Sequence, residues 1–384
     1  MMTMRCTGTL AVALFLASCA PRAIKAAETL DPAQAKSSAD GALLWYDLKS
    51  LPIEGQGWTD TKAPYDRLPG KAEDVVRPAV WRLSQHSTGI CARFTTDSTT
   101  LRARWTLTSP SLAMPHMPAT GVSGLDLYVK TEGGRWRWLA NGRPTKPTNE
   151  VLLVGGLPEG VREYLLYLPL YNGVSSVELG VPKANKLAAP EPRPAGRERP
   201  ILFYGTSITQ GGCASRPGMV HTAILGRKFD CPVINLGFSG NGKMEPELAA
   251  LLAELDPAVF VLDCLPNMNA QEVTERVEPF VKTLRKAHPE TPIVLVEDRF
   301  YADAFLLASK RKHNEENHAA LRIAYERLTA AGVQNLHYLP GGHLLGDDGE
   351  GTVDSSHPTD LGFVRQAEAF AALLGPLLKG EGGK

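Results

Sequence analysis

Five apolar runs in the C-terminal half of the chain constrain its fold more than any other feature. The runs are ILFYG, PVINLG, AVFVLDC, PIVLVE and NLHYLP, which begin at residues 201, 232, 258, 292 and 335. They are continuous rather than alternating, which is typical of strands buried on both faces of a parallel sheet. Between them, apolar residues recur at helical spacing, as in the segments 248–255 and 273–284. This half is therefore predicted to be an α/β domain with a five-stranded, doubly wound (flavodoxin-like) parallel sheet.

The first half of the chain has a different pattern. From about residue 40 to residue 183, short alternating stretches are separated by turn pairs such as Gly133-Gly134 and Asn172-Gly173. Period-two alternation combined with such turns indicates antiparallel strands. Two sheets packed face to face would bury one side of each strand, so an antiparallel β-sandwich is predicted.

A proline-rich stretch separates the two patterns. Residues 186–200 contain four prolines and several charges, a composition that suits an exposed linker. We therefore expect a β-sandwich domain over residues 28–185, a linker over 186–199 and the α/β domain over 200–380.

Residues 1–27 have the features of an export signal. Arg5 precedes the apolar run LAVALFLAS, which is shorter than the roughly 20 residues of a membrane-spanning helix. The run ends in LASC, which resembles the lipobox of bacterial lipoproteins and implies acylation of Cys19. The alternative is an ordinary secretory signal cut before Glu28. We expect an exported protein, either a periplasmic or cell-surface lipoprotein or a secreted one, in which no later segment crosses a membrane.

The charge and the cysteine content limit which partners and which redox state of the cysteines are expected. Lys plus Arg and Asp plus Glu number 41 each, so the formal net charge is zero and nucleic acid is not expected as a partner. Cys91, Cys213, Cys231 and Cys264 remain after cleavage of the signal. Two states stay open for them: a disulfide between Cys213 and Cys231, or thiols buried as small apolar residues.

Polar residues follow the predicted strands of the α/β domain. Ser207 follows the first strand, Gly240 lies in GFSGNG after the second, and Asn267 lies in LPNM after the third. Asp354 and His357 lie in DSSHPTDLGF, between the fifth strand and the last predicted helix. Because an open parallel sheet binds ligands at the carboxyl ends of its strands, we expect these groups to meet at one edge.

The stretch YGTSITQGG after the first strand suits either a phosphate-binding loop or a serine nucleophile. A phosphate loop has a lysine after its glycines, whereas here Gly212 is followed by Cys213. A serine nucleophile needs a base, and DSSHP supplies an imidazole three residues after a carboxylate. The sequence therefore favours Ser207 as a nucleophile, in a mechanism that requires no metal and no cofactor.

Together, these stretches resemble the sequence blocks of the SGNH branch of the GDSL hydrolases. YGTSITQGG is similar to the first block, with Thr206 where the founding pattern has Asp, NLGFSGNG to the second, and DSSHPTDLG to the last. The third block departs, because LPNM lacks the usual glycine and aspartate. The resemblance implies a catalytic triad and an oxyanion hole. The triad would be Ser207, His357 and Asp354, and the oxyanion donors would be the amides of Ser207 and Gly240 and the carboxamide of Asn267.

The first half carries a second resemblance. GLDLY at residues 124–128 resembles the G-x-D-L-Y signature of an N-terminal β-domain found in one group of bacterial SGNH hydrolases. Several carbohydrate esterases also join a β-sandwich to an SGNH domain, so the resemblance implies a serine esterase that deacetylates a carbohydrate or polysaccharide. Its substrate would be an acylated carbohydrate or another small ester. Two alternatives stay open, a lipid or thioester hydrolase of the same family and a non-catalytic glycan-binding lipoprotein.

One loop of the first half also allows two interpretations. His116 lies in the apolar stretch AMPHMPATGVSG. The stretch is either a loop that reaches over the active site or a surface loop packed on itself.

Overall fold

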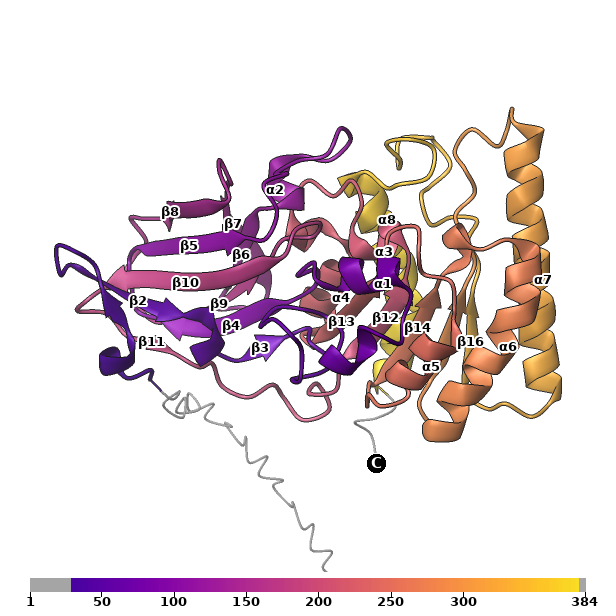
Figure 1. Cartoon of the computed structure of the whole chain (residues 1–384), viewed down its shortest axis with the longest axis horizontal. Coiled ribbons are helices and arrows are strands. Elements are labelled where there is room, and N and C mark those ends of the chain that lie inside the picture. The colour runs from indigo at the N-terminus through magenta and orange to yellow at the C-terminus, as the bar shows by residue number, and fades with distance from the viewer. Residues whose placement is uncertain (1–28, 380–384) are drawn as a thin grey trace, which may run out of the picture.

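The computed structural model describes residues 29–379, so the predicted export signal and Cys19 lie outside the described residues. The chain forms two domains that lie side by side, a β-sandwich at one end and an α/β domain at the other (Figure 1). Both predicted architectures are confirmed.

Two largely antiparallel sheets form the first domain. One has the strand order β1 (Lys36–Ser37), β2 (Leu43–Asp47), β10 (Val174–Pro182), β5 (Leu101–Leu107) and β8 (Thr148–Val154). The other has the order β11 (Leu187–Ala188), β4 (Cys91–Thr96), β9 (Arg162–Tyr167), β6 (Leu125–Lys130) and β7 (Trp136–Gly142), with β3 (Ile53–Glu54) paired to β4. Burial alternates along β5, where Leu101, Ala103, Trp105 and Leu107 are buried and the residues between them are half-buried. The buried side chains of both sheets meet in one core.

The linker begins later than predicted, because Leu187–Ala188 is a strand of the sandwich. Leu187 pairs with Thr96 and Ala188 with Thr95, and the Leu187 side chain is fully buried in the sandwich core. A two-residue strand is too short to produce a periodic pattern, so the sequence could not mark it. Residues 189–200 contain no helix or strand and connect the two domains.

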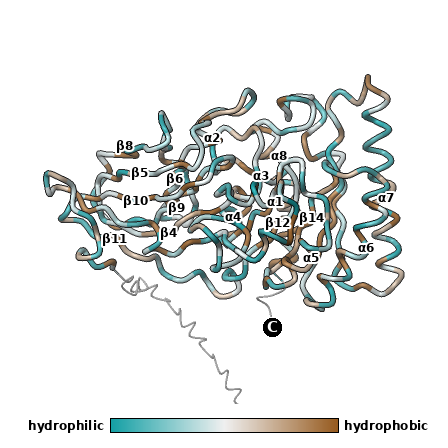
Figure 2. The backbone as a smooth tube through the Cα atoms, viewed as in Figure 1, coloured by the Kyte–Doolittle hydropathy of each residue, from teal (hydrophilic) through white to brown (hydrophobic). Residues whose placement is uncertain are grey.

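The second domain is built on a five-stranded parallel sheet. Its strand order is β13 (Val233–Gly237), β12 (Ile201–Gly205), β14 (Val259–Asp263), β15 (Ile293–Val296) and β16 (Leu336–Leu339). Each strand lies within one of the five apolar runs, and Figure 2 shows hydrophobic residues along β12 and β14. All neighbouring strands are parallel. This order is that of the flavodoxin-like fold, in which ligands bind near the carboxyl ends of the central strands.

Helices cover both faces of this sheet. On one face lie α4 (His221–Phe229) and α8 (Asp360–Lys379), and on the other lie α5 (Pro246–Leu252), α6 (Ala270–Ala287) and α7 (Ala308–Ala330). Because side chains alternate along a strand, Ile201 and Phe203 of β12 pack toward α8, and Leu202 and Tyr204 pack toward α5 and α6. The short helices are η1 (Pro32–Gln34), η2 (Leu48–Ser50), η3 (Gly70–Ala72), α1 (Pro78–Ser84), α2 (Ala119–Val122), α3 (Ser207–Gln210), η4 (Pro217–Met219) and η5 (Leu265–Asn267).

The helix α8 differs from one expectation. By length and composition it is apolar enough to cross a membrane, although no segment after the export signal was expected to be. Its apolar character is explained by packing in the core, because its own Phe363, Phe370 and Leu374 are fully buried. In Figure 1 it lies behind the parallel sheet.

Residues 55–87, here called the crossing segment, leave the sandwich after β3 and return to it at β4. This segment packs on the α/β domain and, within the sandwich domain predicted over residues 28–185, adds no strand to either sheet. Trp58, Val80 and Trp81 are buried in the core that also contains α5 and α6. Trp58 Nε1 also donates a hydrogen bond of 3.1 Å to Glu254, 196 positions away. The segment has no periodic pattern, and its partners are too distant in the sequence to be inferred.

The GLDLY stretch lies where the two domains meet. Asp126 is fully buried in β6 and accepts hydrogen bonds from Arg216 Nη1 and the Gly218 N–H, each at 2.8 Å. A Cβ at Gly218 would lie 2.4 Å from the Tyr128 ring, so the Gly218 backbone packs directly against this ring. Arg216 and Gly218 belong to the loop between α3 and α4. The aspartate and tyrosine of the signature therefore attach this loop to the sandwich.

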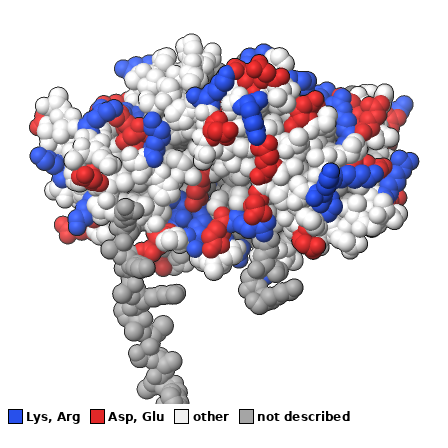
Figure 3. Space-filling view, turned by 60° about the horizontal axis from the view of Figure 1, so that its bottom comes forward, with Lys and Arg blue, Asp and Glu red and all other residues white. Residues whose placement is uncertain are grey.

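The distribution of surface charge agrees with the formal net charge of zero. Positive and negative side chains are interspersed over the surface that Figure 3 presents.

All four cysteines of residues 29–379 are buried and none forms a disulfide, so the cysteines are present as thiols and the Cys213–Cys231 disulfide is not found. Burial raises the pKa of the Cys213 and Cys231 thiols to about 12.

Candidate active site

Ser207 lies at the carboxyl end of β12, where α3 begins. Thr206 caps this helix, because its side chain accepts a hydrogen bond of 3.3 Å from the Ile208 N–H. The Ser207 residue is only 7% exposed. The nucleophile candidate is thus held at the mouth of the sheet by a short, capped helix.

Two glycines allow α3 to approach the sheet. A Cβ at Gly205 would lie 2.1 Å from Thr209 Oγ1, and a Cβ at Gly237 would lie 2.1 Å from the backbone nitrogen of Gln210. Both distances are far below van der Waals contact, so any larger residue would push α3 away from β12 and β13. Gly205 in YGTSITQGG and Gly237 in NLGFSGNG therefore help to set the position of Ser207.

His357 and Asp354 lie on the loop between β16 and α8, and the structure brings them to Ser207. His357 Nε2 is 2.8 Å from Ser207 Oγ, and His357 Nδ1 is 2.8 Å from Asp354 Oδ2. The side chains of His357 and Asp354 are 25% and 41% exposed. The three predicted triad residues therefore form one hydrogen-bonded chain that a substrate can reach from solvent.

Asp354 is fixed by its own loop. Its Oδ1 accepts hydrogen bonds from the backbone N–H groups of Ser356 and His357 at 3.1 and 2.7 Å. Burial raises the pKa of Asp354, but these bonds and the His357 ring outweigh it and bring the pKa below its ordinary value. An ionised carboxylate accepts from Nδ1–H, which leaves Nε2 free to accept the Ser207 hydroxyl proton. This network assigns the tautomer of His357.

The predicted oxyanion donors lie on the loops after β12, β13 and β14. Gly240 is exposed and has a φ of +70°, which favours glycine. Asn267 Oδ1 accepts a hydrogen bond of 3.2 Å from the Gly242 N–H, which leaves the NH₂ of the carboxamide as its free end. Within residues 29–379, the N–H groups of Ser207 and Gly240 and the Asn267 NH₂ donate to no protein acceptor. All three are thus available as donors.

Two residues of the first half reach the same edge. The Tyr171 hydroxyl donates a hydrogen bond of 3.1 Å to the backbone oxygen of Ser207. The centre of the His116 ring lies 6.0 Å from that of His357, so the loop of His116 does reach over the site. Tyr171 was missed, because the sequence does not distinguish a tyrosine bound to a distant backbone from one in an ordinary turn.

Arg67 of the crossing segment supports the loop that carries Gly240. Its fully buried guanidinium donates to the backbone oxygens of Gly237 at 2.7 Å and Asn235 at 3.1 Å. It also donates to two carbonyls of the crossing segment itself. Burial lowers the pKa of Arg67 to about 9, so it stays charged at neutral pH. The carboxyl end of β13 is therefore held by a residue of the first half.

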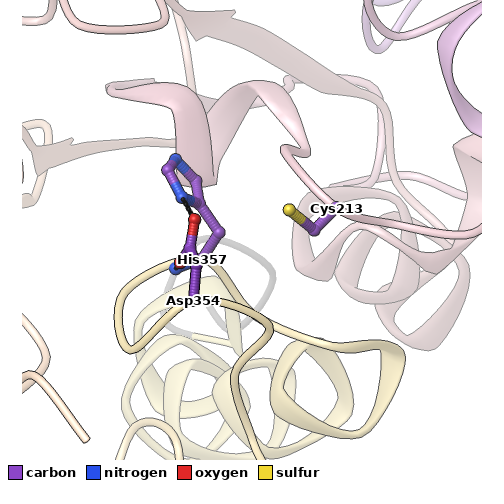
Figure 4. Close-up of side chains that lie close together, drawn as sticks. All are labelled: Cys213, Asp354 and His357. Atoms are coloured by element: carbon purple, nitrogen blue, oxygen red, sulfur yellow. Dashed lines mark hydrogen bonds and ion pairs between the residues drawn. The ribbon is translucent and has the colours of Figure 1, made fainter. Parts of the chain in front are cut away.

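Cys213 lies beside the Asp354–His357 pair (Figure 4). One ligand atom from each of these three residues lies within 4.8 Å of the others, so the group could hold a metal ion. Both ring nitrogens of His357 are already engaged by Ser207 and Asp354. Burial raises the pKa of the Cys213 thiol to about 12, so at neutral pH it lacks the thiolate that binds metal. The arrangement favours the hydrogen bonds of the triad over a metal site.

Comparison with known proteins agrees with this geometry. The GDSL-like Lipase/Acylhydrolase family matches residues 198–375, and the N-terminal domain of SGNH-hydrolase-type esterases matches residues 43–187. A crystal structure of a GDSL-like lipase from Bacteroides ovatus is 35% identical with a TM-score of 0.83, over 88% of this chain and 98% of that chain. The chain belongs to the SGNH/GDSL hydrolase family. As a member of this family the protein is a carboxylic ester hydrolase, which confirms the family and enzyme class predicted from its motifs.

More distant structures share the fold of this SGNH hydrolase. A salicylyl-acyltransferase from a tetracycline biosynthetic pathway is 22% identical with a TM-score of 0.67, over 89% of this chain and 97% of that chain. A family two carbohydrate esterase from Clostridium thermocellum, solved with cellohexaose, is 16% identical with a TM-score of 0.54, over 76% of this chain and 93% of that chain. The comparison with curated proteins found no match.

Proposed function

We propose that this SGNH hydrolase is an exported serine esterase that removes acetyl groups from a carbohydrate or polysaccharide. The observation that carries the proposal is the chain of 2.8 Å contacts from Ser207 through His357 to Asp354. A serine hydroxyl is a weak nucleophile unless a positioned base removes its proton, and this chain supplies both the base and the group that orients it.

In the proposed mechanism His357 acts first as a base and then as an acid. As Ser207 Oγ attacks the ester carbonyl, Nε2 of His357 takes the hydroxyl proton, and Asp354 stabilises the imidazolium. Nε2 then gives this proton to the oxygen of the departing alcohol, which leaves an acetyl group on Ser207. Water attacks the acyl-enzyme with the same proton transfers and releases acetate.

The negative charge of the tetrahedral intermediate needs hydrogen-bond donors. The free N–H groups of Ser207 and Gly240 and the free NH₂ of Asn267 are the candidates. Each well-placed donor typically contributes about 10²- to 10³-fold in rate.

The sugar part of the proposal is supported by the two-domain architecture. Carbohydrate esterases are among the structures that share this fold, including one solved with cellohexaose and an acetyl xylan esterase from the rumen bacterium Butyrivibrio proteoclasticus. Those names describe the relatives, so the acetylated sugar is a proposal for this chain.

One observation favours a second candidate, an esterase for longer acyl chains. Phe305, Leu306 and Leu307 are 71%, 75% and 45% exposed. Their loop is attached to the catalytic loop, because Ser355 Oγ donates a hydrogen bond of 2.5 Å to Asp303. An exposed apolar segment beside an active site is suited to binding an apolar substrate.

Hydrolysis of 4-nitrophenyl acetate and 4-nitrophenyl octanoate tests both candidates. We expect acetate to be preferred and Ser207→Ala to lose about 10⁴- to 10⁶-fold in kcat. Ser309→Ala, which removes an exposed hydroxyl at the start of α7, is the matched control and should keep wild-type turnover. A preference for octanoate would favour the lipid candidate. Equal, slow release by wild type and Ser207→Ala would exclude the esterase and leave the glycan-binding lipoprotein.

Attachment to the membrane through a lipid on Cys19 is also proposed, with plain secretion as the alternative. The support is the LASC sequence alone, since Cys19 lies outside the described residues. Cys19→Ser should abolish palmitate labelling and release the protein from the membrane fraction. Labelling that persists in this variant would exclude the anchor at this position.

A further inference from the structure

The loop that carries His116 is a tight hairpin between the two domains. It precedes α2 (Figure 1), and Met114 and Met117 exchange backbone hydrogen bonds of 3.0 and 3.1 Å across it. Pro115 and His116 therefore form its tip. Both tip residues are exposed, whereas Met117 is 2% exposed.

This hairpin is held firmly against the elements that carry the triad. Met117 packs with Ile208 of α3 and Phe363 of α8 in one buried cluster. Thr120 Oγ1 donates a hydrogen bond of 2.6 Å to the backbone oxygen of Ser215, in the loop after α3. Side-chain packing and a hydrogen bond thus fix the hairpin on both sides, so the position of its tip is set by the fold.

The base of the hairpin is equally fixed. Asn172, which is 1% exposed, accepts a hydrogen bond of 3.1 Å from the Ser109 N–H and donates one of 3.0 Å to the Ser109 oxygen. A loop with both ends and one side anchored orders its tip before any ligand arrives. His116 is therefore presented to the active site in a preorganised position.

The position of the His116 ring relative to His357 determines which part of a substrate it contacts. Its ring centre lies 6.0 Å from that of His357, with the ring planes at 63°. In the proposed mechanism the departing alcohol takes its proton from His357 Nε2, so the alcohol must lie next to this ring. The oxyanion donors belong to the loops after β12, β13 and β14 instead. His116 therefore lies next to the ring that protonates the leaving group, and its loop carries none of the oxyanion donors.

We infer that His116 binds the alcohol portion of the ester, by a hydrogen bond between its imidazole and a hydroxyl of the sugar. A neutral imidazole can donate from one nitrogen and accept at the other, which suits a hydroxyl in either role. The inference rests on the proposed esterase function. It assigns a substrate-binding residue to the sandwich domain, so that both domains contribute residues to the active site.

The test compares two esters that share an acetyl group and differ in the alcohol. One is a mono-acetylated methyl xyloside, whose leaving group carries hydroxyls, and the other is 4-nitrophenyl acetate, whose leaving group carries none. In His116→Ala, kcat/KM for the sugar ester should fall about tenfold more than kcat/KM for 4-nitrophenyl acetate, mainly through KM. His116→Phe keeps a ring without donors and should show the same difference, whereas His116→Gln should recover part of it.

Control variants separate this role from a structural one. Glu132→Ala changes an exposed residue in the turn between β6 and β7 of the same domain and should leave both reactions at the wild-type rate. Equal losses for the two esters in His116→Ala, or no loss for either, would overturn the inference while Ser207-dependent hydrolysis remained. An absence of Ser207-dependent hydrolysis in the wild type would instead overturn the proposed function, and the inference with it.

Discussion

Removal of the Asp126 carboxylate is predicted to destabilise both domains together. Asp126 is fully buried and accepts hydrogen bonds from Arg216, Gly218 and Trp138. Burial raises its pKa despite the opposing effect of Arg216, and a buried ion pair typically contributes little net stability because the cost of desolvation offsets the attraction. Loss of one partner is different, because the Arg216 charge and the Gly218 N–H would lose their acceptor. Such a loss typically costs about 3–5 kcal/mol.

The expected shift in melting temperature follows from the size of the folded chain. Unfolding entropy is about 2.1 cal/mol/K per residue, so the described residues 29–379 correspond to roughly 0.7 kcal/mol/K. Asp126→Ala should therefore lower Tm by about 4–7 °C. Differential scanning calorimetry should show one transition, because the crossing segment belongs to the core of the α/β domain.

A control variant and a double variant test this prediction further. Glu132→Ala removes an exposed carboxylate from the same domain and should change Tm by less than about 1 °C. Asp126→Ala combined with Arg216→Met removes both charges and should recover part of the lost stability. The reasoning is refuted by an Asp126→Ala protein that melts within about 1 °C of wild type, or by a double variant that melts below both single variants.

Two further predictions concern titration. Because the pKa of Asp354 lies below its ordinary value of 3.8, its carboxylate stays charged above that pH, and its interaction with the His357 imidazolium is lost only as pH falls through the lower folded-state pKa. The acid limb of kcat/KM for 4-nitrophenyl acetate should therefore have a slope of one proton down to about pH 4; a slope of two in that range would mean that Asp354 is already being protonated there. The thiols should react slowly with Ellman's reagent at pH 8, since burial raises the pKa of Cys213 and Cys231 to about 12. After denaturation without reductant, a chain that starts at Glu28 should show four thiols, and a count of two would mean that a disulfide forms.

The sequence predicted those features that depend on local patterns. The five strands of the α/β sheet lie within the five apolar runs, because strands buried on both faces need unbroken hydrophobic stretches. The triad candidates could be placed at one edge since every strand of a parallel sheet ends there. Ser207 and His357 are 150 positions apart, yet the topology predicts that they lie at the same edge of the sheet, and the motif resemblance pairs them as nucleophile and base.

Features that depend on contacts between the domains could not be predicted. Arg67 and Tyr171 act on backbone oxygens of the α/β domain, and no sequence pattern identifies a residue whose partner is a distant carbonyl. Trp58 and Trp81 look like sandwich residues by position but belong to the other core. Intrinsic tryptophan fluorescence therefore reports on both domains, whereas the positions of the tryptophans in the sequence suggest that it follows the first domain alone.

The crossing segment has a consequence for the order in which the chain folds. Trp58 and Arg67 leave the ribosome well before Glu254 and Gly237, which lie 196 and 170 positions downstream. Until those residues emerge, the indole lacks the core on which it packs, and the guanidinium lacks two of the four carbonyls that it binds. The N-terminal half therefore cannot complete its folding before the second half has been synthesised, and a holdase chaperone that shields residues 55–87 until then would raise the yield of native enzyme.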